Sequence, residues 1–281
     1  MADTAFQKQY RQEFIAGFEV NQTLLRDAVT TEVQVKGNEA VFLVADSGGA
    51  EAVTRGVDGN IPSRADNLNQ YTAKLVEYHD KVKKTGFNIF SSQGNQRAIM
   101  HKTSMGVINR RIEKSILTEL ANATNNIASA TATVAYAVKA LTILQNNDVP
   151  NDGNIWAIIS PAFLAYLMQT KEFASHDYVR KTPIENTPFW GDRPGFYDWL
   201  GVKWIVTPSV TGTGTNAEQC YMFHKSAIGH AAPAELIMTA SDYNGEDDYS
   251  WTRTSVYEGA KILQNSGILK MIHDGSAYVA S

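Results

Sequence analysis

One long stripe of apolar side chains, between residues 96 and 121, limits the folds that this chain can adopt. The stripe follows the three-and-four spacing of one helical face and consists of Met105, Ile108, Ile112, Ile116, Leu117 and Leu120. The pattern predicts a helix from about Gln96 to Ala121, which would be about 40 Å long and longer than a typical globular helix. Gly106 lies inside it, so we expect a close contact or a slight bend there. We interpret this helix as a structural spine.

The segment before the spine, residues 33 to 90, has an extended character. Short β-type runs such as VQV and AVFLV are broken by glycines between positions 37 and 59. From residue 70 to 90, charged and apolar side chains mix without the clean alternation of a strand that has one buried face. Because an isolated hairpin is only marginally stable, we expect this ribbon to pack against another chain or another domain.

The N-terminal residues indicate an amphipathic helix with an aromatic stripe. Phe6, Tyr10, Phe14 and Phe18 lie four residues apart, and Asp3 is a candidate N-cap. Two interpretations remain open. The helix either packs on the protein's own core or acts as an arm that docks on a neighbouring subunit.

The second half of the chain predicts a mixed sheet with helices beside it. A second helix is indicated by Val134, Val138, Leu141 and Leu144, and an apolar strand at 155–160 leads directly into a helix with Pro161 in its first turn. Further strands are predicted at 202–207 and 219–224, and strand-like runs around an acidic turn from Glu235 to His273. Residues 171 to 200 are expected to form an irregular aromatic loop of the kind found at interfaces. The fold class is therefore α+β.

Composition excludes several classes of protein. A formal net charge of -4 and a pI near 5.9 argue against a protein whose main task is to coat nucleic acid. The chain has one cysteine, Cys220, so it forms no intrachain disulfide. No export signal is visible at the N-terminus, and no apolar run reaches the roughly 18 residues needed to span a bilayer. We expect production in the cytoplasm and no membrane association.

Two motifs imitate ligand sites without the required context. Residues 212–217 match a relaxed dinucleotide fingerprint, but a strand-like run follows where a helix is needed, so we expect a turn. The acidic stretch from Asp242 to Asp248 resembles the start of a calcium loop, yet Asp247 stands where Gly is needed and Arg253 where the bidentate Glu is needed. A solvated turn is the main interpretation, and a weak, non-specific cation site is the alternative.

The nucleophiles and histidines form no recognisable constellation. Cys220 lies in an apolar strand, where a buried inert thiol is the common case. The six histidines are not spaced as in an HExxH motif or a zinc site. Some of them directly precede an Asp, but neighbours in the sequence do not form a catalytic triad. The histidines are His79, His101, His176, His224, His230 and His273. We therefore assign no catalytic, cofactor-binding or metal residue, expect no cofactor, and predict that the protein is not an enzyme.

Three stretches of the chain carry a resemblance to a known family: AVTRGVDGNIP at 52–62, LVEYHDKVKKTGFNIFSSQGNQRAIM at 75–100 and the more generic GAKILQNSGILKM at 259–271. They resemble the major capsid proteins of tailed bacteriophages with the Hong Kong 97-like fold. The resemblance implies an N-terminal arm (1–32), an extended β-hairpin loop (33–90), a peripheral domain with the spine helix (91–131 and 235–281) and an axial domain (132–234). It also implies that the C-terminal residues return to complete the peripheral sheet.

The resemblance further implies how such a protein works. It would self-assemble as hexamers and pentamers into the icosahedral head that encloses double-stranded DNA, without sequence-specific binding. Its partners would be a separate scaffolding protein, a portal and possible decoration proteins, and its location the virion capsid. An encapsulin-like nanocompartment shell is the alternative within the fold, and a small-molecule α/β enzyme is the alternative from another class.

Overall fold

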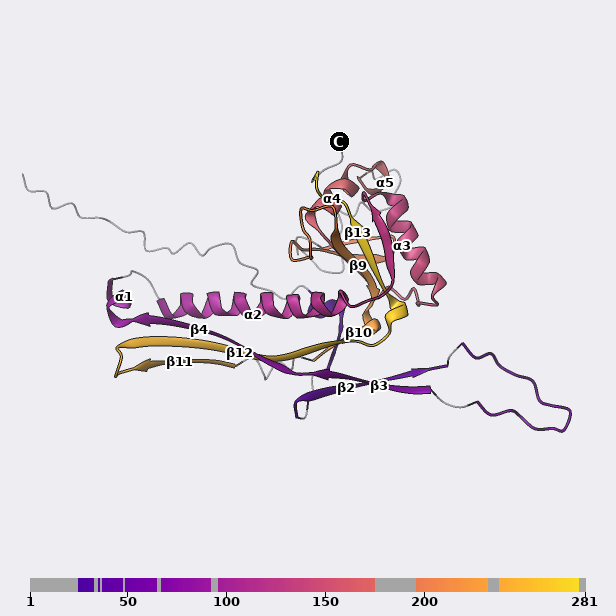
Figure 1. The fold of residues 1–281 in the computed structure, drawn as a ribbon, viewed down its shortest axis with the longest axis horizontal. Coiled ribbons are helices and arrows are strands. Elements are labelled where there is room, and N and C mark those ends of the chain that lie inside the picture. The colour runs from indigo at the N-terminus through magenta and orange to yellow at the C-terminus, as the bar shows by residue number, and fades with distance from the viewer. Residues whose placement is uncertain are drawn as a thin grey trace, which may run out of the picture.

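A computed structural model describes residues 25–32, 35, 37–47, 49–64, 67–91, 96–174, 196–231 and 238–277. Figure 1 shows an elongated lobe, a compact lobe and a hairpin that projects from the region between them. The predicted aromatic helix of residues 3–18, His176 and most of the predicted aromatic loop lie outside the described residues.

The elongated lobe is a thin sheet covered on one face by the long helix. Strand β12 (Tyr249–Ile262) pairs antiparallel with β4 (Val76–Thr85), β11 (Met238–Asn244) and β10 (Ile228–Ala231), and β1 (Thr30–Glu32) runs parallel to β10. Helix α2 (Gln96–Leu120) lies along β4 and β12, and the short α1 (Gly86–Ser91) follows β4 (Figure 1). The predicted spine helix is confirmed.

The apolar stripe of α2 forms the centre of the first core. Ile108, Ile112, Ile116, Leu117 and Leu120 are buried. They pack with side chains from both sheets, including Tyr221, Val256 and Ile268. The stripe therefore joins the two lobes, which the helical period alone does not reveal.

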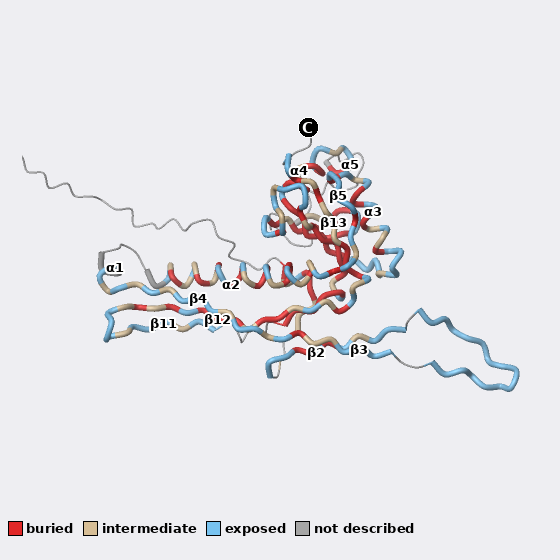
Figure 2. The backbone as a smooth tube through the Cα atoms, in the orientation of Figure 1, coloured by how far each residue is buried: buried red, intermediate tan, exposed pale blue. Residues whose placement is uncertain are grey.

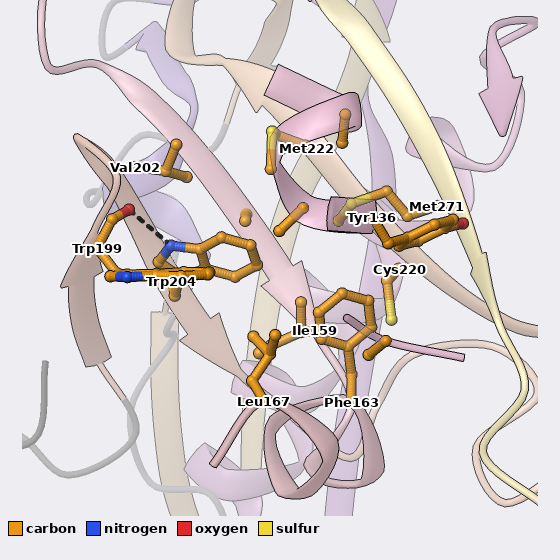
Figure 3. Close-up of a cluster of buried hydrophobic side chains, with 14 of the residues drawn as sticks. Tyr136, Ile159, Phe163, Leu167, Trp199, Val202, Trp204, Cys220, Met222 and Met271 are labelled. Atoms are coloured by element: carbon orange, nitrogen blue, oxygen red, sulfur yellow. Dashed lines mark hydrogen bonds between the residues drawn. The ribbon is translucent and has the colours of Figure 1, made fainter. Parts of the chain in front are cut away.

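The compact lobe is a six-stranded mixed sheet with helices against it. Its strand order is β5 (Asn126–Ala130), β13 (Ile268–His273), β9 (Glu218–His224), β6 (Ile155–Ile159), β8 (Val202–Val206) and β7 (Phe196–Trp199). Helices α3 (Val134–Asn146), α4 (Pro161–Met168) and α5 (Lys171–Ala174) accompany it. The core beneath them (Figure 3) contains Phe163, Trp204 and Cys220, and the Trp204 indole donates to the Trp199 carbonyl at 3.0 Å.

Local sequence signals account for the helices of this lobe. The Ser160 hydroxyl accepts a hydrogen bond from the Phe163 amide at 3.1 Å, and Pro161 occupies the first turn of α4 as predicted. Helix α3 also begins where predicted, but its buried face consists of Tyr136, Ala137, Ala140 and Leu144. The predicted stripe was wrong at Val138, which is 41% exposed, whereas Val134, Leu141 and Leu144 do pack against this core.

The strand pairings differ from the predicted ranges at several places. Strand β13 was expected to complete the peripheral sheet, but it lies between β5 and β9 in the compact lobe. Conversely, β10 falls within the range predicted as axial but pairs with β12. The reason is burial: four of the six residues of β13 are apolar and none is exposed, so the strand takes an interior place in a sheet.

Two further corrections concern segments predicted as irregular or extended. The range 33–90 contains the hairpin strands β2 (Glu39–Asp46) and β3 (Asn67–Lys74), but also β4, which belongs to the elongated lobe, and helix α1. The range 171–200 begins with α5 and ends with β7. Within the described residues no helix is long and apolar enough to cross a bilayer.

Candidate functional site

The most prominent surface feature is the hairpin of residues 39–74, which we call the projecting hairpin. Its strands pair antiparallel from Glu39 opposite Lys74 to Asp46 opposite Asn67. Every described residue from 49 to 64 is exposed, and Figure 2 shows this loop extending away from both lobes. A segment of this length that contacts little of its own chain is available to contact another.

The root of the projecting hairpin is firmly anchored. Ala40, Phe42 and Ala73 are buried against Ala231 and Leu263. The Phe42 ring lies so close to Gly229 that an added Cβ there would be 2.7 Å from it. At Gly259 an added Cβ would be 2.4 Å from the Lys74 carbonyl oxygen. The strands therefore leave the body in a direction set by backbone-to-backbone packing.

The outward part of the projecting hairpin exposes apolar side chains. On the strand face away from the anchor, Leu43 is 64% exposed and Leu68 is 61% exposed, and Val41 lies beside them. Val53, Val57 and Ile61 are exposed in the loop. Clustered exposed apolar side chains mark protein–protein contact surfaces.

The loop of the projecting hairpin is ordered by local bonds. The Gly56 amide donates to the Asn60 carbonyl at 2.9 Å, and Gly59 has a positive φ of 78° in that turn. Nearer the strands, the Arg64 guanidinium donates to the Ser47 carbonyl at 3.1 Å. The loop thus has a defined shape while its apolar side chains remain exposed.

The sheet face of the elongated lobe opposite α2 is a second exposed surface. Lys81 lies 5.0 Å from the Trp251 ring centroid, and Lys83 lies 4.6 Å from that of Tyr249. Strand β4 does alternate, contrary to the prediction. The alternation was hidden because polar residues face the helix: Asp80 accepts from the Ser104 hydroxyl at 2.5 Å.

A buried ionic cluster lies near the root of the projecting hairpin. The carboxylate of Glu258 is 3.3 Å from His230 Nε2 and 3.7 Å from Arg111 Nε, and Glu258 and His230 are fully buried. The Arg111 guanidinium also stacks on Tyr78, 3.9 Å from its ring centroid. The cluster connects α2, β4, β10 and β12, so it ties the helix to the strands that hold the hairpin. No sequence spacing indicated it.

A second buried cluster brings Ser160, Glu218 and His273 together. The Ser160 hydroxyl donates to Glu218, the Gly214 amide donates to Glu218 Oε1 at 2.7 Å, and His273 Nε2 is 3.9 Å from Glu218 Oε2. Burial lowers the pKa of His273, while the Ala130 carbonyl, Glu218 and Asp274 oppose that shift. The serine hydroxyl faces the carboxylate and not the imidazole, so the arrangement holds strands together and does not activate a nucleophile.

The ligand-like motifs form turns. Gly212 and Gly214 have positive φ angles of 81° and 78° in a turn that leads into β9, as predicted. The acidic stretch is the β11–β12 turn, where the Tyr243 hydroxyl donates to Asp248 Oδ1 at 2.7 Å. Among the described residues no three His, Cys, Asp or Glu side chains gather in a way that could hold a metal ion.

The single thiol and the remaining histidines lie apart from one another. Cys220 is fully buried in the compact lobe, where desolvation raises its pKa to about 12. His224 lies 3.1 Å from Asp152, whose pKa is lowered to about 2, mainly by the Asn154 and His224 hydrogen bonds. His79 is held by Ser255 at 2.7 Å on the open sheet face, and His101 lies on α2.

Comparisons with known proteins agree with this geometry. A family model described as phage capsid protein matches residues 2–274. A solved structure from Mycobacterium phage Che8 has a TM-score of 0.75 at 14% identity, covering 96% of this chain and 98% of that one. The capsid of cyanophage Pam1 gives a TM-score of 0.72 at 11% identity and covers 98% of both chains. That of cyanophage P-SCSP1u gives 0.72 at 13% identity, covering 96% and 93%.

A search of curated proteins found no match. At these low identities the solved structures show the fold, and the family model shows the family. They support the α+β class and do not favour the encapsulin-like alternative. The chain belongs to the phage capsid protein family, and it is a major capsid protein that forms the phage head.

Proposed function

We propose that this protein builds the head by docking its projecting hairpin on neighbouring subunits. The exposed apolar side chains of that hairpin carry the proposal: Leu43, Leu68 and Ile61 are each more than half exposed on a segment anchored at one end. Burying them against another subunit would remove apolar surface from water, which is favourable and does not occur in the isolated chain.

Family membership supports a proposal for the wider assembly. The subunits would form hexamers and pentamers of a closed shell around double-stranded DNA, made in the host cytoplasm with a separate scaffolding protein, a portal and possible decoration proteins. The protein would act structurally and not as an enzyme. We also propose a domain division that follows the sheets: a peripheral unit around β4, β10, β11, β12 and α2, and an axial unit around β5 to β9 and β13.

The test removes the loop without touching the core. Asp46 and Asn67 are paired, so an Asn-Gly turn in place of residues 47–66 can close the hairpin directly. Deleting residues 38–85, an obvious choice from sequence, would also remove β4 from the sheet under α2. We expect the short-loop variant to fold with a near-normal thermal midpoint but to form no closed shells by electron microscopy when produced with its neighbouring gene products.

A variant whose loop keeps its length separates the effect of the loop's side chains from the effect of its length. Replacing residues 47–66 with a Gly/Ser segment of equal length keeps the span but removes Val53, Val57 and Ile61. We expect it to assemble poorly as well. Normal shells from the short-loop variant would refute docking through this loop, and normal shells from the Gly/Ser variant alone would show that only its length matters.

A further inference from the structure

The outward face of helix α2 carries positive charge without exposed negative charge. Lys102, Arg110 and Lys114 are exposed along it. The helix has two acidic residues. Glu113 is buried. Glu119 forms an ion pair with Lys261 at 3.6 Å and accepts a hydrogen bond from the Ile262 amide at 3.1 Å. The acidic side chains of α2 are thus engaged within the protein while three basic ones point outward.

These three basic side chains form no ion pair among the residues that the structure describes. Arg110 and Lys114 are also one helical turn apart, and like charges at that spacing destabilise a helix by a few tenths of a kcal/mol. An external anion bound along the helix would remove this repulsion.

The geometry of the face favours an extended polyanion. Lys102 and Lys114 lie about 18 Å apart along the axis of a straight helix and about a third of a turn apart around it, so a rigid element holds their charges along one broad face. The exposed positions between them include Val107 but no aromatic side chain. Protein interfaces centre on buried aromatic and apolar anchors, whereas phosphate backbones are bound mainly by Lys and Arg.

The opposite face of the elongated lobe carries both positive and negative side chains. There Lys81 and Lys83 lie over aromatic rings, and the exposed carboxylates of Glu77 and Asp242 lie on the same face. Its positive charge is therefore partly balanced. The charge of -4 for the whole chain makes the unbalanced row on α2 a local feature and not a general property.

We propose that the outward face of α2 is turned toward the interior of the shell and binds the phosphate backbone of packaged duplex DNA without sequence selectivity. This inference rests on the proposed function, because it needs a shell that encloses DNA. Three phosphate contacts per subunit are weak individually. Repeated over a shell, they would hold the outer layer of DNA against the wall while letting it slide.

The test measures binding of a fluorescent duplex of about 30 bp to the unassembled full-length protein, from about 50 to 200 mM salt. The triple variant K102Q/R110Q/K114Q removes the row. The matched control, K81Q/K83Q/R253Q, changes the charge equally on the opposite face, where Arg253 of β12 is exposed and pairs with Lys81. We expect the first to lower the slope of log affinity against log salt by about 3, and the control to leave it nearly unchanged.

Three results would overturn the proposal. They are equal losses in the two triple variants, no binding by the unaltered protein at about 50 mM salt, and tighter binding of polyglutamate of equal charge than of the duplex. The last would identify an acidic polypeptide as the ligand. Shell formation is scored separately by electron microscopy, so a protein that binds duplex but never forms shells would contradict the proposed function and not the binding surface.

Discussion

At the scale of single residues, this protein buries several ionisable side chains, and the carboxylates of Glu258 and Glu218 show how such groups are held. Glu258 lies between His230 and Arg111, and Glu218 accepts hydrogen bonds from Ser160 and the Gly214 amide. Buried charges are tolerated only when they are paired or hydrogen-bonded. None of these pairs follows from sequence spacing, because their members come from different strands and helices.

His273 makes stability depend on pH. Its pKa is lowered from 6.5 by burial, so as pH falls the unfolded chain takes up the proton before the folded protein does. This contribution to stability is therefore complete above pH 6.5 and is lost as pH falls below it. We expect the wild type to lose more stability than H273Q between about pH 7.5 and 5.5, measured by denaturant unfolding. Equal losses in both proteins would contradict this assignment.

At the scale of elements, close backbone packing decides where the projecting hairpin leaves the body. Strand β12 passes β3 so closely that Gly259 leaves no room for a Cβ beside the Lys74 carbonyl. Within the elongated lobe, α2 packs on β12, and buried hydroxyl residues come from both elements: Ser104 from the helix, and Thr252 and Thr254 from the strand. Such polar residues at inward positions are why the sequence did not reveal which face of β4 is covered.

The glycine contact can be tested with a matched pair. In G259A the new methyl would meet a backbone carbonyl, so the hairpin root must shift, and we expect a loss of about 1–3 kcal/mol in unfolding free energy. In G245A, in the β11–β12 turn, the nearest atom is a Tyr243 side-chain carbon at 3.9 Å, an ordinary contact. We expect little change there. Similar unfolding free energies for the two variants would argue against a tightly packed root.

At the scale of the whole molecule, one of the buried clusters is shared by the two lobes, and the projecting hairpin extends beyond it. Ile108 and Ile112 of α2 pack in the same cluster as Trp156 and Tyr221 of the compact lobe. The body should therefore resist local opening, whereas the loop of residues 49–64 is exposed throughout. This contrast is what an assembling subunit requires: a stable body and an accessible contact segment.

Limited proteolysis should report this contrast. Arg55 lies in the exposed loop, so trypsin is expected to cleave after it early in unassembled subunits, as identified by mass spectrometry of the fragments. In assembled shells the same bond should be cleaved at least about tenfold more slowly, because docking on a neighbour covers it. An unchanged cleavage rate in shells would place the loop in solvent and contradict docking.

The sequence by itself determined the elements whose signals are local. The spine helix, the strand at Ile155–Ile159 and the Ser160–Pro161 start of α4 follow from apolar period, run length and capping, all of which act within a few residues. The resemblance of three stretches also identified the family before any pairing was known. That the protein is not an enzyme remains a prediction.

Only the tertiary structure decided which sheet each strand joins. Strand β13 entered the compact lobe and β10 the elongated one, although their places in the chain predicted the reverse, and Val138 is exposed on the helix face predicted to be buried. The basic residues Lys102, Arg110 and Lys114 can be read from the sequence, and so can Lys81, Lys83 and Arg253. Only the structure shows that the two sets lie on opposite faces of the elongated lobe with different neighbours. The physical reason is that strand pairing and burial depend on contacts between residues far apart in the chain, which local periodicity does not encode.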